Sequence, residues 1–316
     1  MDASISIGHI RDAASVIDPI FLYSPQFVSE PLSERLAVTT VLKVETMNPI
    51  RTFKGRGTDY LLHRLEADSR GLVCASAGNF GQGMAYACRK RGRQLTVFAA
   101  LTANPMKVAR MRALGATVEL QGDDFDEAKD AAKHHATQSG DLYVEDGLLG
   151  AIAEGAGTIA VELAELAPPL DAVFVPLGNG SLVNGMGTWL KLATPDIRVV
   201  AVCAESAPSM ALSWKARSPI TAPSTTIADG IAVRVPIAEA VGLMPGTVDD
   251  VTLVSDDEML AAMRAVFADV GVLVEPAAAA GIAAIAKDAA KYAGQRVAAI
   301  LTGGNLTKDQ VRNWLQ

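Results

Sequence analysis

The chain has 316 residues, of which 50% are hydrophobic and 20% are charged, and its formal net charge at pH 7 is −7. This acidity argues against nucleic acid or an anionic membrane as the main partner, so a small-molecule ligand is expected. The length allows one large or two ordinary domains with a sizeable core.

The three cysteines, Cys74, Cys88 and Cys203, are far apart and lie in apolar stretches. They form no CxxC pair and no disulfide framework, which is typical of reduced core thiols in a cytoplasmic protein. The first ten residues lack a basic start followed by an apolar core, and no stretch of about 18 apolar residues is uninterrupted. The sequence predicts neither secretion nor a membrane span.

Short β-branched runs alternate with longer stretches of helical period, which predicts βαβ units and mostly parallel sheets. Four of the predicted strands lie between residues 71 and 147, enough for a small sheet domain inserted in a larger one. The predicted strands are 37–44, 72–75, 95–99, 117–120, 142–144, 172–176, 199–203, 251–254 and 297–301. The predicted helices include 58–67, 82–91, 125–137, 152–166, 257–269 and 277–290.

One lysine stands at the start of a helical stretch in the segment NPIRTFKGRG, residues 48–57. A lysine in such a place is most often a solvated surface charge, since Lys is rarely buried without a partner. Lys54 becomes a candidate covalent handle because of the segments that follow it.

Three glycine-rich turns each follow a predicted strand: SAGNFGQG at 76–83, GNGSLVNG at 178–185 and TGGN at 302–305. Strand ends are where α/β proteins build their sites. Neither of the first two turns is a nucleotide motif, because the third glycine of a dinucleotide fingerprint and the Lys of a P-loop are missing. Backbone N–H groups at 178–182 could bind a phosphate before a helix, although a simple tight turn would look the same.

In order and spacing, these four segments resemble the fold-type II family of pyridoxal-phosphate (PLP) enzymes, which includes threonine and serine dehydratases, serine racemase, cysteine synthase and threonine synthase. The resemblance runs from about residue 40 to 306. It implies an α/β fold of the tryptophan synthase β type, with two domains of twisted, mostly parallel sheets flanked by helices. It also implies a small domain of residues 71–148, a large domain of residues 1–70 and 149–316, and PLP in the cleft between them.

The resemblance implies a role for each segment. Lys54 matches the catalytic lysine that forms the Schiff base and moves the α-proton, and Thr302 matches the residue facing the pyridine nitrogen. Asn79 matches a donor to the cofactor's ring oxygen, although alone it would pass for an ordinary turn residue. The implied cofactor-binding residues are Lys54, Phe53, Asn79, Gly178, Asn179, Gly180, Ser181, Leu182 and Thr302. The implied substrate-binding residues are Ser76, Ala77, Gly78, Asn79, Phe80 and Gly230.

The segment ADGIAV at 228–233 resembles the serine/threonine dehydratase branch. Ala77 stands where racemases carry a serine, which argues against racemisation. Phe80 stands where dehydratases often carry His, which favours a bulkier β-substituent, unless Phe80 packs into the core. Glu205 matches the first acid of a cation site found in some members, but Ala211 replaces its aspartate, so no metal is predicted.

We therefore expect a PLP-dependent ammonia-lyase (dehydratase) that converts a β-hydroxy-α-amino acid, either threonine, serine or a bulkier phenylserine-type substrate, to a 2-oxo acid and ammonia. The cysteine pattern favours a cytoplasmic protein, and the net charge argues against nucleic-acid or membrane partners. The family resemblance suggests a homodimer. A β-replacement synthase or a racemase of the same fold is an alternative. A non-catalytic α/β ligand-binding protein is another, and the presence of Lys54 argues against it.

Overall fold

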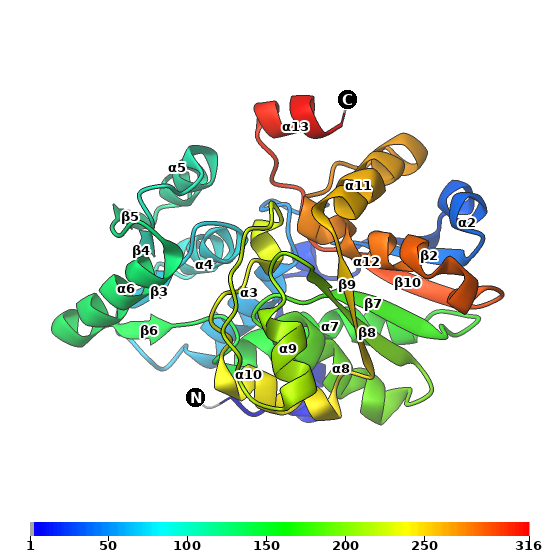
Figure 1. Ribbon diagram of the computed structural model, residues 1–316. Helices are drawn as coiled ribbons and strands as arrows, with labels where there is room; N and C mark the ends of the chain where they lie inside the picture. The colour runs from blue at the N-terminus through cyan, green and yellow to red at the C-terminus, as the bar shows by residue number, and fades with distance from the viewer. Residues whose placement is uncertain (1–2, 316) are drawn as a thin grey trace.

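Two sheets organise the computed structural model, which describes residues 3–315 (Figure 1). The larger sheet has the order β1-β2-β10-β7-β8-β9, and only β1 runs antiparallel to its neighbour. The smaller sheet has the order β5-β4-β3-β6 and is entirely parallel. The strands are β1 Gln26–Val28, β2 Thr39–Val44, β3 Leu72–Ala75, β4 Leu95–Ala99, β5 Thr117–Leu120, β6 Leu142–Val144, β7 Ala172–Pro176, β8 Arg198–Ala204, β9 Asp250–Val254 and β10 Arg296–Leu301.

Helices cover both faces of each sheet, as the burial of parallel strands requires. The α-helices are α1 Ile7–Val16, α2 Glu30–Leu36, α3 Lys54–Arg64, α4 Asn79–Lys90, α5 Pro105–Ala113, α6 Phe125–Ser139, α7 Gly150–Ala164, α8 Ser181–Ala193, α9 Ser209–Ala216, α10 Ala238–Leu243, α11 Asp256–Val270, α12 Pro276–Lys287 and α13 Lys308–Trp314. Four 3-10 turns are η1 Pro19–Phe21, η2 Asp229–Ile231, η3 Met244–Gly246 and η4 Ala289–Tyr292.

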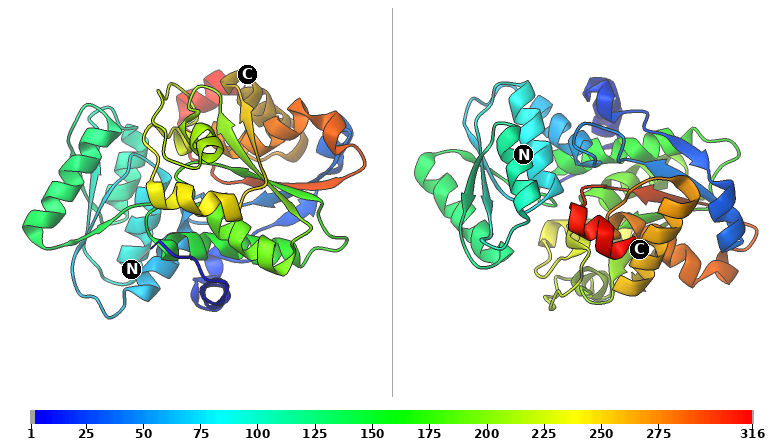
Figure 2. Two further views of the ribbon diagram at one scale, coloured as in Figure 1. Left: turned by 60° about the horizontal axis from the view of Figure 1, so that its bottom comes forward. Right: turned by 90° about the horizontal axis from the view of Figure 1, so that it is seen from above.

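The small sheet with α4, α5 and α6 forms one lobe, and the rest of the described chain forms the other (Figure 2). We call these the small lobe and the large lobe. In the large lobe, α2, α11 and α12 pack on one face of the sheet and α1, α7 and α8 on the other. In the small lobe, α6 covers one face, and α4 and α5 cover the other together with α3. Helix α3 therefore joins the two cores.

The α/β class and the nine predicted strands are confirmed, five of them (β3 to β7) with the predicted bounds. The pattern does not predict β1, an edge strand of three residues with two of them exposed. Helices α3 and α4 begin at Lys54 and Asn79, earlier than the predicted 58 and 82.

The earlier helix starts correct the interpretation of the glycines. Gly81 lies inside α4 rather than in a turn, and Gly55 lies inside α3. A Cβ at Gly55 would overlap the ring of Phe21, and one at Gly81 would overlap the sulfur of Met111. These glycines are therefore needed for close packing of the helices, which outweighs their poor helix propensity.

All three cysteines are buried and free, and burial raises the pKa of the Cys88 and Cys203 thiols to about 12. In residues 3–315 no helix is long and apolar enough to cross a membrane. The same residues contain no group of three or more His, Cys, Asp or Glu side chains that could hold a metal ion.

Candidate active site

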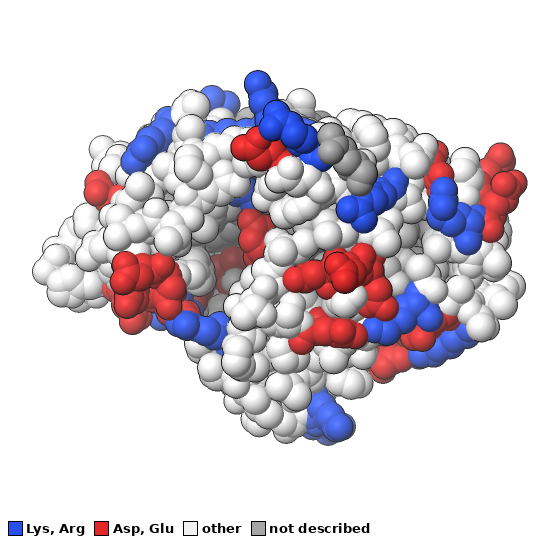
Figure 3. Space-filling view, turned by 45° about the horizontal axis from the view of Figure 1, so that its top comes forward, with Lys and Arg blue, Asp and Glu red and all other residues white. Residues whose placement is uncertain are grey.

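A cavity of about 450 Å³ lies between the two lobes. Figure 3 shows the hollow with acidic side chains on its wall. The carboxyl ends of β2, β7 and β10 reach it from the large sheet, and those of β3 and β6 from the small sheet, through the loops that follow them. The structure brings every predicted cofactor-binding and substrate-binding residue to the wall of this one cavity.

Backbone contacts to the end of β10 fix the position of Lys54. The amide of Phe53 and the hydroxyl of Thr52 both donate to the carbonyl of Thr302, each at 3.0 Å. The amide of Gly304 donates to the carbonyl of Arg51 at 3.0 Å. The residues just before α3 are therefore hydrogen-bonded to the residues just after β10. This pairing places Lys54 and Thr302 on the same cavity.

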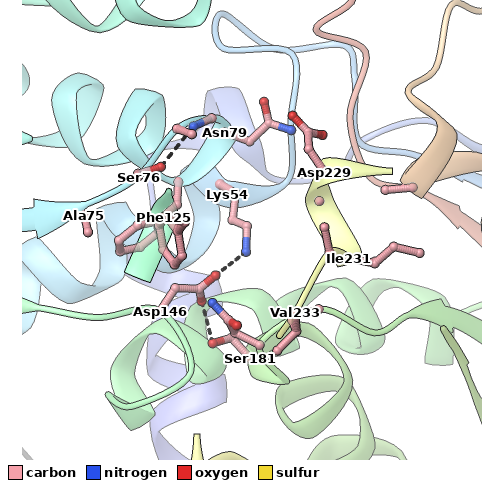
Figure 4. Close-up of a pocket in the computed structure, with 18 of the residues that line it drawn as sticks. Lys54, Ala75, Ser76, Asn79, Phe125, Asp146, Ser181, Asp229, Ile231 and Val233 are labelled. Atoms are coloured by element: carbon pink, nitrogen blue, oxygen red, sulfur yellow. Dashed lines mark hydrogen bonds and ion pairs between the residues drawn. The ribbon is translucent and has the colours of Figure 1, made fainter. Parts of the chain in front are cut away.

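The amine of Lys54 contacts a carboxylate that the sequence did not single out. Lys54 Nζ lies 2.5 Å from Asp146 Oδ2, and the Ser181 hydroxyl donates to Asp146 Oδ1 at 2.7 Å (Figure 4). The Asp146 side chain is 9% exposed. It lies in the loop between β6 and α7, where the only signal in the sequence is an acid shortly after a predicted strand.

A buried group of charged side chains packs against α3, the helix that begins at Lys54. The Arg56 guanidinium donates to Glu45 Oε1 at 2.9 Å and to Glu162 Oε1 at 2.5 Å, and Lys43 also pairs with Glu162. Burial opposes the charge of Arg56, but the two carboxylates outweigh burial and raise its pKa. Burial likewise works against the Glu162 carboxylate, but Arg56 and Lys43 hold its pKa below the ordinary value. Two cations and two anions therefore balance beneath the helix that begins at Lys54.

The start of α8 forms an anion-binding wall. The first N–H groups of a helix have no intrahelical partner, and Gly180, the N-cap of α8 with a φ of +95°, has no side chain that could cap them. A Cβ at Gly178 would lie 2.6 Å from the carbonyl oxygen of Gly230, so the loop packs directly on that segment. Such N–H groups can bind a phosphate without a long side chain.

Asn79 is oriented by a network that crosses the cleft. Its Nδ2 donates to Glu275 Oε2 at 2.7 Å, and its Oδ1 accepts from Asn305 Nδ2 at 2.8 Å. An amide nitrogen carries two hydrogens, so one remains for a ligand. Burial raises the pKa of Glu275, whose Oε1 lies 3.5 Å from Lys107 Nζ of the small lobe. Glu275, the residue before α12, therefore links Asn79 and Lys107 of the small lobe to the large lobe.

The loop before α4 offers fewer free donors than the sequence suggests. The Ser76 oxygen accepts from the amides of Gly78, at 3.2 Å, and Gly81, at 2.9 Å. Those two amides are thereby used within the loop. Phe80 lines the cavity but is 7% exposed and packs into the core of the small lobe.

A second aromatic ring, absent from the sequence predictions, is better placed for a ligand. Phe125, the first residue of α6, is 43% exposed and lines the cavity. It lies on one side of the cavity, while Ile231 and Val233 lie on the other (Figure 4). These three side chains give an apolar character to part of the wall.

The donor set fits PLP. An amine on the wall of the cavity can bind the aldehyde, a helix start can bind the phosphate, and the hydroxyl of Thr302 and the amide of Asn79 can face the ring. The fold and site thus define a two-lobed α/β enzyme of the PLP type. A family model described as "Pyridoxal-phosphate dependent enzyme" matches residues 19–303. The chain belongs to this family.

Relatives agree with this assignment. The chain is 32% identical over 310 residues to the L-threonine ammonia-lyase of Thermotoga maritima, covering 97% of this chain and 77% of that protein. It is 33% identical over 300 residues to the biosynthetic, chloroplastic threonine dehydratase of Arabidopsis thaliana, covering 93% of this chain and 50% of that protein. The chain therefore spans about half the length of the latter.

Among solved structures, maize serine racemase has a TM-score of 0.91 and 27% identity, and the match covers 98% of this chain and 96% of that one. This likeness includes both lobes, so the two-lobed arrangement is shared with maize serine racemase.

Proposed function

We propose that this protein is a PLP-dependent ammonia-lyase acting on β-hydroxy-α-amino acids, with release of a 2-oxo acid and ammonia. The observation that carries the proposal is the single cavity that joins Lys54, the start of α8 and Thr302. The threonine ammonia-lyase and threonine dehydratase relatives, which match nearly the whole chain, support the reaction type.

PLP, when bound, supplies an electron sink that weakens the bonds at the substrate's α-carbon. The side chains and backbone of the protein would supply the proton transfer, the phosphate binding and the orientation of the ring. Lys54 Nζ binds the cofactor and then accepts the proton from the α-carbon, while the N–H groups at the start of α8 bind the phosphate. The Thr302 hydroxyl would face the ring nitrogen without adding a charge, and Asn79 would orient the ring from the opposite lobe.

The substrate's side chain is proposed to lie along Phe125, Ile231 and Val233. Contact with an aromatic ring contributes about 0.5–1.5 kcal/mol beyond area burial, which amounts to a several-fold preference. A phenylserine-type substrate should therefore compete well with threonine and serine. Ala77 lines the cavity and carries no hydroxyl that could return a proton to the second face, which favours elimination over racemisation.

The test is a panel of L-serine, L-threonine and L-phenylserine, assayed for ammonia and 2-oxo acid. We expect both products, no D-enantiomer, and a visible absorbance that borohydride removes. Lys54→Ala should lose turnover and the lysine-linked absorbance. Wild-type turnover in Lys54→Ala would refute the role of the lysine, and rapid formation of D-amino acid or incorporation of an added nucleophile would favour the racemase or synthase alternatives.

We also propose a small domain of residues 71–148 inserted in a large one, and a homodimer in the cytoplasm. The lobes described above support the division, the three free buried thiols support a reducing compartment, and the family resemblance supports the dimer. Light scattering of the purified protein tests the dimer, and limited proteolysis near residues 71 and 148 tests the division.

A further inference from the structure

The closest polar partner of Lys54 Nζ is a carboxylate from the other lobe. Asp146 follows β6 of the small sheet, whereas Lys54 begins α3 after β2 of the large sheet. Asp146 Oδ2 lies 2.5 Å from Nζ, and both side chains are mostly buried, with 9% and 17% exposed. Figure 4 shows the two groups facing each other in the cavity, with Ser181 beyond Asp146.

The neighbouring charged residues do not compete with Lys54 for the Asp146 carboxylate. The neighbouring acid, Glu145, pairs with Lys129 at 2.5 Å and lies 3.8 Å from Lys133. Among residues 3–315, Asp146 has no ion-pair partner other than Lys54, and its second oxygen is fixed by the Ser181 hydroxyl. The carboxylate is therefore oriented, with one oxygen held and the other directed at the amine.

We propose that Asp146 gives and receives the proton at Lys54 Nζ, so that the reacting group of this site is a Lys54–Asp146 pair rather than a lone lysine. A carboxylate within hydrogen-bond reach of a reacting nitrogen meets the geometric requirement for general acid–base catalysis. Ser181 acts as a positioning residue through Asp146.

Two steps need this proton transfer. When Nζ bonds to the aldehyde carbon of PLP, two hydrogens leave the nitrogen and the carbonyl oxygen departs with them as water. Asp146 can take each proton from Nζ and return it to that oxygen, so the step is balanced. In turnover, a proton passes from the α-carbon to Nζ, the C–O bond breaks with its electron pair on oxygen, and the pair returns one proton as water leaves. The first step rests on the family alone, and the second rests on the proposed function.

The first experiment measures capture of PLP, which requires no substrate. Protein stripped with hydroxylamine is mixed with PLP, and the visible absorbance is followed by stopped flow. Asp146→Asn should slow capture about 100-fold, the lower end for loss of a general acid–base group, with the same final absorbance. Asp146→Glu keeps the carboxyl and should recover most of the rate. Ser181→Ala should give a smaller loss.

Glu145→Gln is the matched control, because it removes the same charge from the adjacent residue of the loop but affects contacts to Lys129, Lys133 and Tyr143 instead of the contact to Lys54. Its capture rate should equal that of wild type. The inference is overturned if Asp146→Asn captures PLP at the wild-type rate, or if Glu145→Gln slows capture equally. If Asp146→Asn does not fold, the test rests on Asp146→Glu. A rate of PLP capture in Asp146→Glu that is no higher than in Lys54→Ala would also overturn the inference.

The second experiment compares ammonia release from threonine in the same variants. Asp146→Asn should lower kcat roughly 100-fold with little change in KM. If wild type releases no ammonia while Asp146→Asn still slows capture, the proposed function fails and the pair stands. If wild type releases ammonia and Asp146→Asn matches it in both assays, the pair fails and the proposed function stands.

Discussion

Arg56→Met should strongly destabilise the fold, because Arg56 neutralises two buried carboxylates at once. The side chain is fully buried, and Glu45 and Glu162 are 0% and 6% exposed. Lys43 would still pair with Glu162, but Glu45 would keep only a hydroxyl contact from Ser24, at 2.5 Å. Removing one partner of a buried ion pair costs about 3–5 kcal/mol, since the other charge stays buried without compensation.

Urea unfolding at pH 7, followed by circular dichroism, measures this cost from the shift in midpoint. The matched control is Arg35→Met, which breaks an equally well-formed pair with Asp269, at 2.6 Å, on the exposed surface. We expect only a small change there, because water replaces an exposed partner. A loss below about 1 kcal/mol in Arg56→Met, or equal losses in both variants, would refute the reasoning.

The pH dependence of the unfolding free energy tests the same electrostatic explanation. Because the folded-state pKa of Glu162 is lowered, its stabilisation is complete above the unfolded value of about 4.3 and is lost as pH falls further. In Arg56→Met the unpaired carboxylates gain protons more readily, which relieves the mutant in acid. The difference in unfolding free energy between the two proteins should therefore shrink from pH 7 to pH 4. A difference that stays constant would contradict an electrostatic origin.

Three further predictions concern the cavity. Gly178→Ala should displace the 178–182 loop from the Gly230 carbonyl at a cost of about 1–3 kcal/mol, so equilibrium dialysis should show roughly tenfold weaker PLP binding. Gly242→Ala, where a Cβ meets nothing within 4 Å, should bind PLP normally. Phe125→Ala should lower kcat/KM for phenylserine several-fold more than for threonine, and an unchanged ratio would exclude the aromatic contact. Thr302→Asp should protonate the ring nitrogen and lower kcat for ammonia release, which the panel assay measures directly.

The parts of the site that lie in strand-end segments could be predicted from the sequence. Lys54, the 178–182 loop and Thr302 each follow a short apolar run, and parallel strands bring their carboxyl ends to one edge. The strand pattern thus already implied that these segments meet. The glycines were harder to interpret, because a glycine in a turn and a glycine under a crossing side chain look alike in the sequence.

Asp146 and Phe125 could not be predicted, for a physical reason. Both belong to loops or helix starts of the small lobe, and their role depends on how closely that lobe approaches the large one. The hydrophobic periodicity of the sequence carries no information on the distance between the two lobes. Phe80 shows the converse. Its position in the motif suggests a substrate-binding residue, but most of its surface is buried in the core of the small lobe.

Contacts between the lobes also indicate where the cavity opens. Arg234 of the large lobe pairs with Asp124, at 3.0 Å, and with Asp126 at the start of α6, and Arg234 and Asp124 are nearly half exposed. Lys107 pairs with Glu275 and Asp229, but its own side chain is 4% exposed. The side chains of Lys107 and Glu275 are both 4% exposed, whereas water readily replaces the partners of Arg234. The lobes should therefore part first between Arg234 and α6, next to Phe125.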